Sequence, residues 1–289
     1  TITTTVHDND VAFVMISKME AAVEEGAVQD TYQVSLQTKP TADVTVTATR
    51  DADVLVEPTS LTFTPKTWNV KQTVTLTAIN DDIDEPLELH TVTHAATSSD
   101  PFYEGAPLTF SGNVSVNVTD NDRAGITLSK TSVTVKEQGQ SDFYTIRLNS
   151  DPDVTHGADE PNCRVTVEVT DTYDVSVSPS VLVFTSSNWN VAQRVNVTAK
   201  DDNVDEELEA QIITQAAFST GSSNYNGTRA NFSNNGNVAV SIYDDADSAA
   251  IILSKAEVHV QEGLVNDTYT VVLQSDPDVT HGAHGGLNE

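Results

Sequence analysis

Cysteine and basic residues are scarce in this chain of 289 residues. Cys163 is its one cysteine, so no disulfide can form within the chain, and its domains must be stabilised by their cores or by bound ions. Lys and Arg number 14 against 43 Asp and Glu, which gives a formal net charge of −29. Such a charge repels nucleic acid and anionic membranes and attracts divalent cations, so we expect no nucleic-acid partner.

A general acidic surface would also keep a protein soluble in a salty medium without forming any specific site. Diffuse acid would be scattered along the chain, whereas much of this acid lies in short runs at repeated positions. The pattern therefore favours cation sites over a surface that only solvates the chain.

Long apolar runs and catalytic motifs are also missing. No stretch approaches the ~20 apolar residues that span a bilayer, and no signal peptide is visible, so we expect no direct membrane insertion. The chain starts in a strand-like run and stops within a repeat, as expected of an excerpt from a longer repetitive protein. No Ser-His-Asp set, glycine-rich phosphate loop, Cys/His metal box or basic aromatic patch is visible, so we do not expect an enzyme.

The sequence repeats itself over a long period. Residues 63–72 (FTPKTWNVKQ) recur as residues 184–193 (FTSSNWNVAQ), 121 positions later (63 to 184). Unit starts align at Lys18, Lys130 and Lys255, each followed by an acidic turn with Gly and a strand with Tyr. A period above ~100 residues indicates whole domains in tandem rather than a solenoid of small repeats.

Apolar and polar residues alternate within each unit. Val74, Leu76 and Ala78 are separated by threonines, which is the pattern of half-buried antiparallel strands. About seven such strands per ~110 residues predict an all-β fold of tandem immunoglobulin-like antiparallel β-sandwiches. The predicted domains are residues 1–10, the end of a preceding repeat; residues 11–122 and 123–247, two complete sandwiches; and residues 248–289, the start of a further, truncated repeat.

Three distinctive side chains are expected in or on the cores. Cys163 has the strand parity of Val165 and Val167, so it should point inward as an inert thiol. Trp68 and Trp189 each lie just before a strand, and packing against the core is favoured over a carbohydrate-binding platform.

Three acidic elements recur in each unit: an early turn with Glu, an Asp-rich loop and a closing pair of acidic residues. Strand ends from distant segments meet at one pole of a sandwich, so these elements are expected to converge there. Carboxylates held together repel one another without a cation, and calcium takes several hard oxygen ligands in irregular geometry. The alternative is three unrelated solvated turns, since Asp and Asn favour turns in any case.

The order of these motifs resembles the Calx-β domain, found in the regulatory region of sodium–calcium exchangers and in large extracellular repeat proteins. The motifs are Glu-x-Gly, Phe-Thr followed by Trp-x-x-x-Gln, Asp-Asp-x-x-x-Glu and a closing Asp-x-Asp. The resemblance implies calcium as the cofactor, held by carboxylates at one end of each sandwich, near the junction with the next domain. The implied ligands are Glu25, Asp53, Asp81, Glu85, Asp120 and Asp122 in the first full unit, and Glu137, Asp174, Asp201, Asp202, Glu206, Asp244 and Asp245 in the second.

Two positions of the first unit depart from this ligand set. Asn80 stands where the second unit has Asp201, and Asn121 stands where it has Asp245. An amide carries no charge, so the first calcium site is predicted to be weaker or vacant.

Asn-x-Ser/Thr sequons make the chain a candidate glycoprotein. Asn113, Asn117 and Asn196 have the outward strand parity, so glycans there are sterically possible. The candidate positions are Asn113, Asn117, Asn196, Asn226, Asn231 and Asn266.

The predicted function is structural: a calcium-stiffened spacer, or a filament or adhesion component, outside the cell or on its surface. The expected partners are neighbouring repeats of the same chain and other copies in a filament. Two alternatives stay open at this point, a calcium-sensing regulatory module and a non-catalytic accessory region of a larger secreted enzyme.

Overall fold

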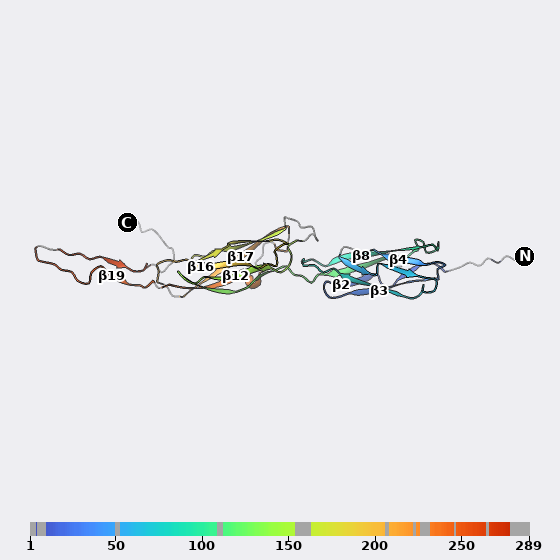
Figure 1. Ribbon diagram of the computed structural model, residues 1–289, viewed down its shortest axis with the longest axis horizontal. Coiled ribbons are helices and arrows are strands. Elements are labelled where there is room, and N and C mark those ends of the chain that lie inside the picture. Colours follow the sequence, from blue (N-terminus) through green and yellow to red (C-terminus); the bar gives the residue numbers. More distant parts are fainter. Residues whose placement is uncertain are drawn as a thin grey trace. The chain divides into compact units, whose positions relative to one another are not determined.

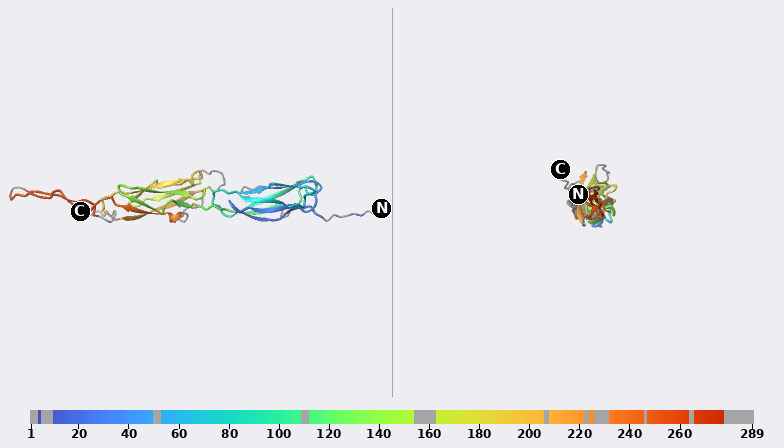
Figure 2. Two further views of the ribbon diagram at one scale, coloured as in Figure 1. Left: turned by 60° about the horizontal axis from the view of Figure 1, so that its bottom comes forward. Right: turned by 90° about the vertical axis from the view of Figure 1, so that its left-hand side faces the viewer.

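The computed structural model describes residues 4, 10–49, 53–108, 112–153, 163–205, 208–221, 224–225, 232–245, 247–263 and 266–277. The chain divides into two compact units, Thr1–Arg123 (unit 1) and Ala124–Glu289 (unit 2) (Figure 1). In the described residues of each unit, strands run along its length and form two layers (Figure 2). No helix among those residues has the length and apolar character needed to cross a bilayer.

Unit 1 consists of two facing sheets. The four-stranded sheet has the order β1-β3-β7-β5, with β1 (Val14–Ile16), β3 (Asp30–Leu36), β7 (Gln72–Ala78) and β5 (Val54–Glu57). The five-stranded sheet has the order β2-β9-β8-β4-β6, with β2 (Glu20–Glu24), β9 (Asn113–Thr119), β8 (Glu88–Ser98), β4 (Val44–Ala48) and β6 (Ser60–Phe63).

Alternation along the strands builds the core between the sheets. Val74 and Leu76 of β7 are fully buried, while the threonines between them face outward. Tyr32 and Phe63 are the bulkiest strand residues of this core, and Trp68 packs against its edge. Burial of one face of each strand supplies the main stabilising free energy, at roughly 25 cal/mol per Å² of apolar surface.

Unit 2 repeats the arrangement. Its four-stranded sheet has the order β10-β12-β16-β14, with β10 (Ile126–Leu128), β12 (Asp142–Leu148), β16 (Gln193–Ala199) and β14 (Val175–Ser178). Its five-stranded sheet has the order β11-β18-β17-β13-β15, with β11 (Ser132–Lys136), β18 (Asn237–Tyr243), β17 (Glu209–Thr220), β13 (Arg164–Thr170) and β15 (Val181–Phe184). A 3₁₀ turn, η3 (Ser233–Gly236), precedes β18. The predicted all-β sandwich fold is confirmed in both units.

One strand pair in each five-stranded sheet is parallel rather than antiparallel. β2 pairs with β9 in unit 1, with Val23 opposite Val118, and β11 pairs with β18 in unit 2. The cause is a sheet switch near the start of each unit, because the chain leaves β1 or β10, bends, and continues in the other sheet. Residues of the first acidic turn thereby lie beside the last strand of the same unit.

The predicted core residues lie where expected. Cys163 is buried, and its Sγ atom packs against the backbone of Gly221, where a Cβ would stand 2.6 Å from the sulfur. Gly221 also has a φ of +85°, which favours glycine. Trp189 packs against the core of unit 2, and its carbonyl accepts a hydrogen bond from Leu148 N at 2.9 Å.

A Lys–Asp contact joins the residues after the first strand of each unit to the start of its third strand. Lys18 Nζ lies 2.5 Å from Asp30 Oδ1, and Lys130 Nζ lies 2.6 Å from Asp142 Oδ1. The same contact joins Lys255 to Asp267 in the hairpin of β19 (Ile251–Leu253) and β20 (Val271–Leu273). The pair β19–β20 therefore repeats the Lys–Asp contact of the pairs β1–β3 and β10–β12, although its apolar residues are exposed.

Candidate metal centres

The early acidic turn of unit 1 places a carboxylate in the interior. Glu25 follows β2, is only 3% exposed, and donates its backbone N–H to Thr119 O at 3.0 Å. Gly26 makes the turn possible, with φ +65° and no room for a side chain, since a Cβ would lie 2.8 Å from Asn80 Oδ1. The turn thus aims Glu25 at the other two acidic elements.

Two groups of carboxylates in unit 1 share Glu25. Ligand oxygens of Glu25, Asp81 and Glu85 lie within 4.8 Å of one another, and so do those of Glu25, Asp120 and Asp122. Backbone N–H groups fix the acids: Glu85 N donates to Asp120 Oδ2 and Asp122 N donates to Asp120 Oδ1, both at 2.8 Å. The structure therefore brings together the Glu turn, the Asp-rich loop and the closing Asp pair.

The electrostatics of this cluster disfavour a full set of negative charges. Burial, and next the charges of Asp81 and Asp120, raise the pKa of Glu25 to about 7. Burial, Asp120 and Asp82 likewise raise the pKa of Asp122. The Oε2 atom of Glu25 is buried and has no hydrogen-bond partner. A buried oxygen of this kind has lost its water and gained nothing in return, which a bound cation would correct.

Asn80 and Asn121 replace two carboxylates with a neutral contact. Asn121 Nδ2 donates to Asn80 Oδ1 at 2.7 Å and to the carbonyl of Glu25 at 3.0 Å. Asn80 Nδ2 donates to the carbonyl of Asp81 at 2.9 Å. The two amides therefore tie the three acidic elements of unit 1 together without adding charge.

Unit 2 gathers a related set of three carboxylates among its described residues. Ligand oxygens of Glu137, Asp244 and Asp245 lie within 4.8 Å of one another, and Glu137 is only 2% exposed. Asp202 Oδ1 accepts the Val204 N–H at 2.8 Å, as Asp81 Oδ1 accepts that of Ile83 in unit 1.

The pKa of Asp247, which follows the closing acids of unit 2, is affected by the charges of those acids. Its pKa is raised by partial burial and then by the charges of Asp245, Asp244, Asp201 and Asp202. Among the described residues, no group of ligand atoms joins Asp201 or Asp202 to Glu137. Glu206, the remaining predicted ligand of this loop, lies outside the described residues.

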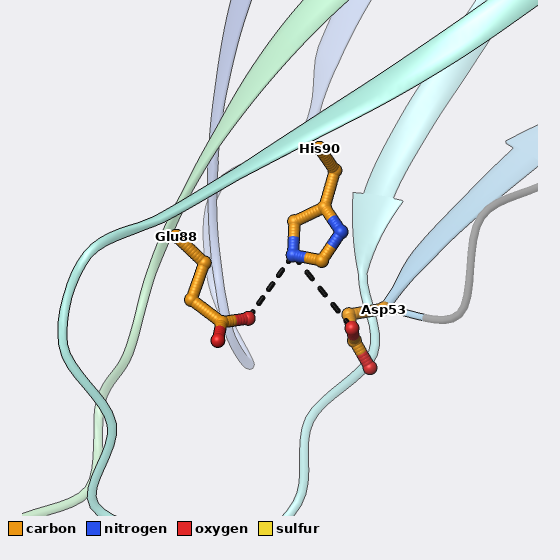
Figure 3. Close-up of side chains that lie close together, drawn as sticks. All are labelled: Asp53, Glu88 and His90. Carbon is orange, nitrogen blue, oxygen red and sulfur yellow. Dashed lines mark hydrogen bonds and ion pairs between the residues drawn. The ribbon is translucent and has the colours of Figure 1, made fainter.

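Asp53 and Asp174 have different neighbours from the other predicted ligands. Asp53 lies beside Glu88 and His90 (Figure 3). The Nε2 atom of His90 is 3.0 Å from Glu88 Oε2 and 3.6 Å from Asp53 Oδ2. Asp174 Oδ2 accepts a hydrogen bond from Gln211 Nε2 at 2.6 Å. In the described parts of the chain, no group of ligand atoms joins Asp53 to Glu25.

Sequence reasoning missed Glu88 and His90. Both have the strand parity of the buried Val92, which a period-two reading of β8 assigns to the inner face. This inward parity, directly after the Asp-rich loop, is the sequence signal that could have identified Glu88 and His90 as site residues.

The described sequons lie on the surface. Asn113, Asn117, Asn196 and Asn266 are exposed, so the outward parity predicted for the three strand positions is confirmed. Asn226 and Asn231 lie outside the described residues.

Comparisons with known proteins give no family. No family model matches the chain, and no curated protein matches it. Among solved structures, CBD12 from CALX1.2 is 16% identical over 71% of this chain and 80% of its own, with a TM-score of 0.31. The apo-form Calx CBD1 domain is 19% identical over 42% of this chain and 99% of its own, with a TM-score of 0.28. Protocadherin gamma B7 extracellular cadherin domains 1–4 are 12% identical over 92% of this chain and 60% of their own, with a TM-score of 0.32.

Proposed function

We propose that this chain is part of a structural extracellular array of Calx-β-like sandwiches, stiffened by calcium at the acidic end of each unit. One observation carries the proposal. The buried Glu25 carboxylate stands between two pairs of acidic side chains, and one of its oxygens has no hydrogen-bond partner.

Calcium fits the donors around Glu25 better than other common cations. The five carboxylates of Glu25, Asp81, Glu85, Asp120 and Asp122 supply hard oxygens from three loops. Calcium takes six to eight such oxygens with irregular geometry, whereas magnesium demands a near-ideal octahedron and retains water. A divalent ion would also remove the repulsion that raises the pKa of Glu25 and Asp122.

The mechanical role follows from where the ligands lie along the chain. Asp120 and Asp122 are the last acidic residues of unit 1, which ends at Arg123. Asp244 and Asp245 likewise come after the last strand of the second sandwich. A cation that binds these residues would hold the end of each sandwich against its own Glu turn and Asp-rich loop, and would limit motion of the segment that leads onward.

The chemistry of the surface supports an extracellular setting. A net charge of −29 suits a medium with abundant divalent cation, and extracellular calcium modules work at dissociation constants of roughly 10⁻⁴–10⁻³ M. Sequons on exposed strand faces are compatible with that setting. The partners in this proposal are neighbouring repeats of the same chain and other copies in a filament.

Calcium titration calorimetry of the full chain tests the calcium proposal. We expect binding that is reduced by Glu25→Gln, reduced by Glu137→Gln, and lost in the double variant. Asp43→Asn is a matched control, because Asp43 precedes β4 beside Ser98, at the opposite end of β8 from Glu88 and the closing acids of unit 1. Absence of calcium binding to the wild-type chain, or equal binding by the double variant, would refute the calcium mechanism and leave an acidic spacer.

A further inference from the structure

Three side chains at one end of unit 1 connect its two sheets. Asp53 immediately precedes β5 of the four-stranded sheet, while Glu88 and His90 belong to β8 of the five-stranded sheet. One imidazole nitrogen faces both carboxylates (Figure 3). The side chains are sheltered, with exposed fractions of 13% for His90, 25% for Asp53 and 29% for Glu88.

The strand pattern holds this geometry in place. Glu88 and His90 are two residues apart on one strand, so they share a face, and that face continues into the buried Val92. Asp53 is held through its carbonyl, which accepts the Ile79 N–H at 3.0 Å. The three donors are therefore fixed by backbone pairing in both sheets rather than by a free loop.

The distances from His90 Nε2 to the two carboxylates are compatible with those around a small tetrahedral ion. Zinc binds imidazole nitrogen and carboxylate oxygen at about 2.0–2.2 Å, so neighbouring donors in a tetrahedron lie about 3.3 Å apart. The two separations from His90 Nε2, 3.0 Å to Glu88 and 3.6 Å to Asp53, bracket that value. Imidazole also selects borderline ions such as zinc, whereas calcium prefers oxygen alone.

We propose that Asp53, Glu88 and His90 form a binding site for a borderline divalent transition-metal ion of the zinc class, with a fourth position open to water. Two carboxylates and a neutral imidazole exactly balance a divalent charge. The ion would link the two sheets of unit 1 at this end. The proposal is independent of calcium binding at the Glu25 groups, which share none of these three residues.

Unit 2 provides an internal comparison. Asp174, Glu209 and Gln211 stand 121 positions after Asp53, Glu88 and His90 (53 to 174). Gln211 uses its amide as a hydrogen-bond donor to Asp174 Oδ2 at 2.6 Å, so the same place in unit 2 is closed by an amide–carboxylate hydrogen bond. An amide nitrogen has no lone pair for a metal, and the carboxylates alone lack the ligand that selects zinc.

Zinc titration of the full chain in saturating calcium, with a chromophoric chelator as competitor, tests the site. The absorption spectrum of bound Co²⁺ shows whether a nitrogen ligand is present. The wild-type chain should bind zinc at a site that His90→Gln weakens at least ~10-fold. Gln211→His should create a further site of the same kind in unit 2. His94→Gln is the control, because this buried histidine lies on the same strand and should leave zinc affinity unchanged.

The outcomes separate the metal site from a plain ion pair. An imidazolium between two carboxylates would give the same distances, but then His90→Gln would not change zinc affinity and Gln211→His would add no site. Either result overturns the proposal, as does displacement of zinc by calcium. Thermal unfolding of each variant in chelator shows whether it folds, and Gln211→His tests the site through gain even if His90→Gln is unstable.

Discussion

The Tyr32 hydroxyl and His94 Nε2 lie 2.5 Å apart in the core of unit 1, with their rings edge to face at 5.3 Å between centroids. His94 Nδ1 lies 2.8 Å from the carbonyl oxygen of Gly112, which can only accept, so Nδ1 carries the proton and Nε2 accepts from Tyr32. In unit 2, Gln215 donates to the hydroxyl of Tyr144 at 2.6 Å in the same place. Only the contact in unit 1 thus contains a histidine, whose charge can change in mildly acidic solution.

Acid should destabilise unit 1 through His94. Burial lowers the pKa of His94 below its ordinary value of 6.5, so the unfolded chain binds more protons in mildly acidic solution. The stabilising effect of neutral His94 is complete above about pH 6.5 and is lost as the pH falls towards the folded pKa, by up to ~1.4 kcal/mol per pH unit. His94→Gln should remove this loss of stability. The measurement is thermal unfolding of full chains followed by Trp68 fluorescence, with Trp189→Phe added so that Trp68 is the remaining tryptophan.

The difference between wild type and His94→Gln isolates this effect. Glu25 and Asp122 have raised pKa values and therefore act with the opposite sign, but they are present in both chains. An acid-side loss of the same size in His94→Gln would show that another group is responsible.

Replacement of Glu25 by Gln should separate apo stability from calcium response. Without calcium the variant should unfold at the same temperature as wild type or higher, because a buried charge near Asp81 and Asp120 has been removed. Calcium should raise the free energy of unfolding of the wild type by about 2.7 kcal/mol at a hundredfold excess over Kd. In the variant, this increase should be lost in unit 1 only. Fluorescence of Trp68 and Trp189 distinguishes the two units. A calcium-induced rise that survives in unit 1 would exclude Glu25 as a ligand.

Unit 1 should bind calcium more weakly than unit 2, and the two asparagines should be the cause. Asn80→Asp with Asn121→Asp gives unit 1 the acids of unit 2 and breaks the 2.7 Å amide contact. We expect tighter calcium binding, on the order of tenfold, together with lower stability in chelator. Calorimetry and melting of the full chain measure both. Unchanged affinity would mean that these two positions do not face the ion.

The Lys130–Asp142 contact should owe most of its stabilising effect to the aspartate. Asp142 accepts the N–H groups of Thr134 and Phe143 as well as Lys130 Nζ, and these hydrogen bonds lower its pKa although burial acts the other way. Asp142→Ala should cost about 1–3 kcal/mol, because two backbone donors lose their acceptor. Lys130→Met should cost at most about 1 kcal/mol, as for an exposed ion pair. Denaturant unfolding followed by Trp189 checks the order, and equal costs would contradict it.

The regular parts of this protein could be predicted from the sequence because they depend on short-range pattern. Val74, Leu76 and Ala78 reveal a buried strand face through a period of two, and Cys163 follows its valines inward by the same rule. The repeated acidic elements could be located because the chain repeats them.

Lateral contacts between distant loops could not be predicted in the same way. The Asn80–Asn121 hydrogen bond and the approach of Asp53 to His90 depend on which strand ends meet, and no local pattern encodes that. The parallel β2–β9 pair was missed for a related reason, because alternation gives the inner face of a strand but not the direction of its neighbour.

The central claim, that calcium stiffens the array, is tested most directly by the distance distribution between spin labels in the two sandwiches. Ser60 and Val181 are exposed at matching positions of β6 and β15, and Cys163→Ala removes the native thiol before Ser60→Cys and Val181→Cys are labelled. In pulsed electron–electron double resonance, we predict a broad distribution in chelator that narrows on saturation with calcium, and no narrowing when Glu25→Gln is added. A width that stays the same while calorimetry shows calcium bound would contradict the account.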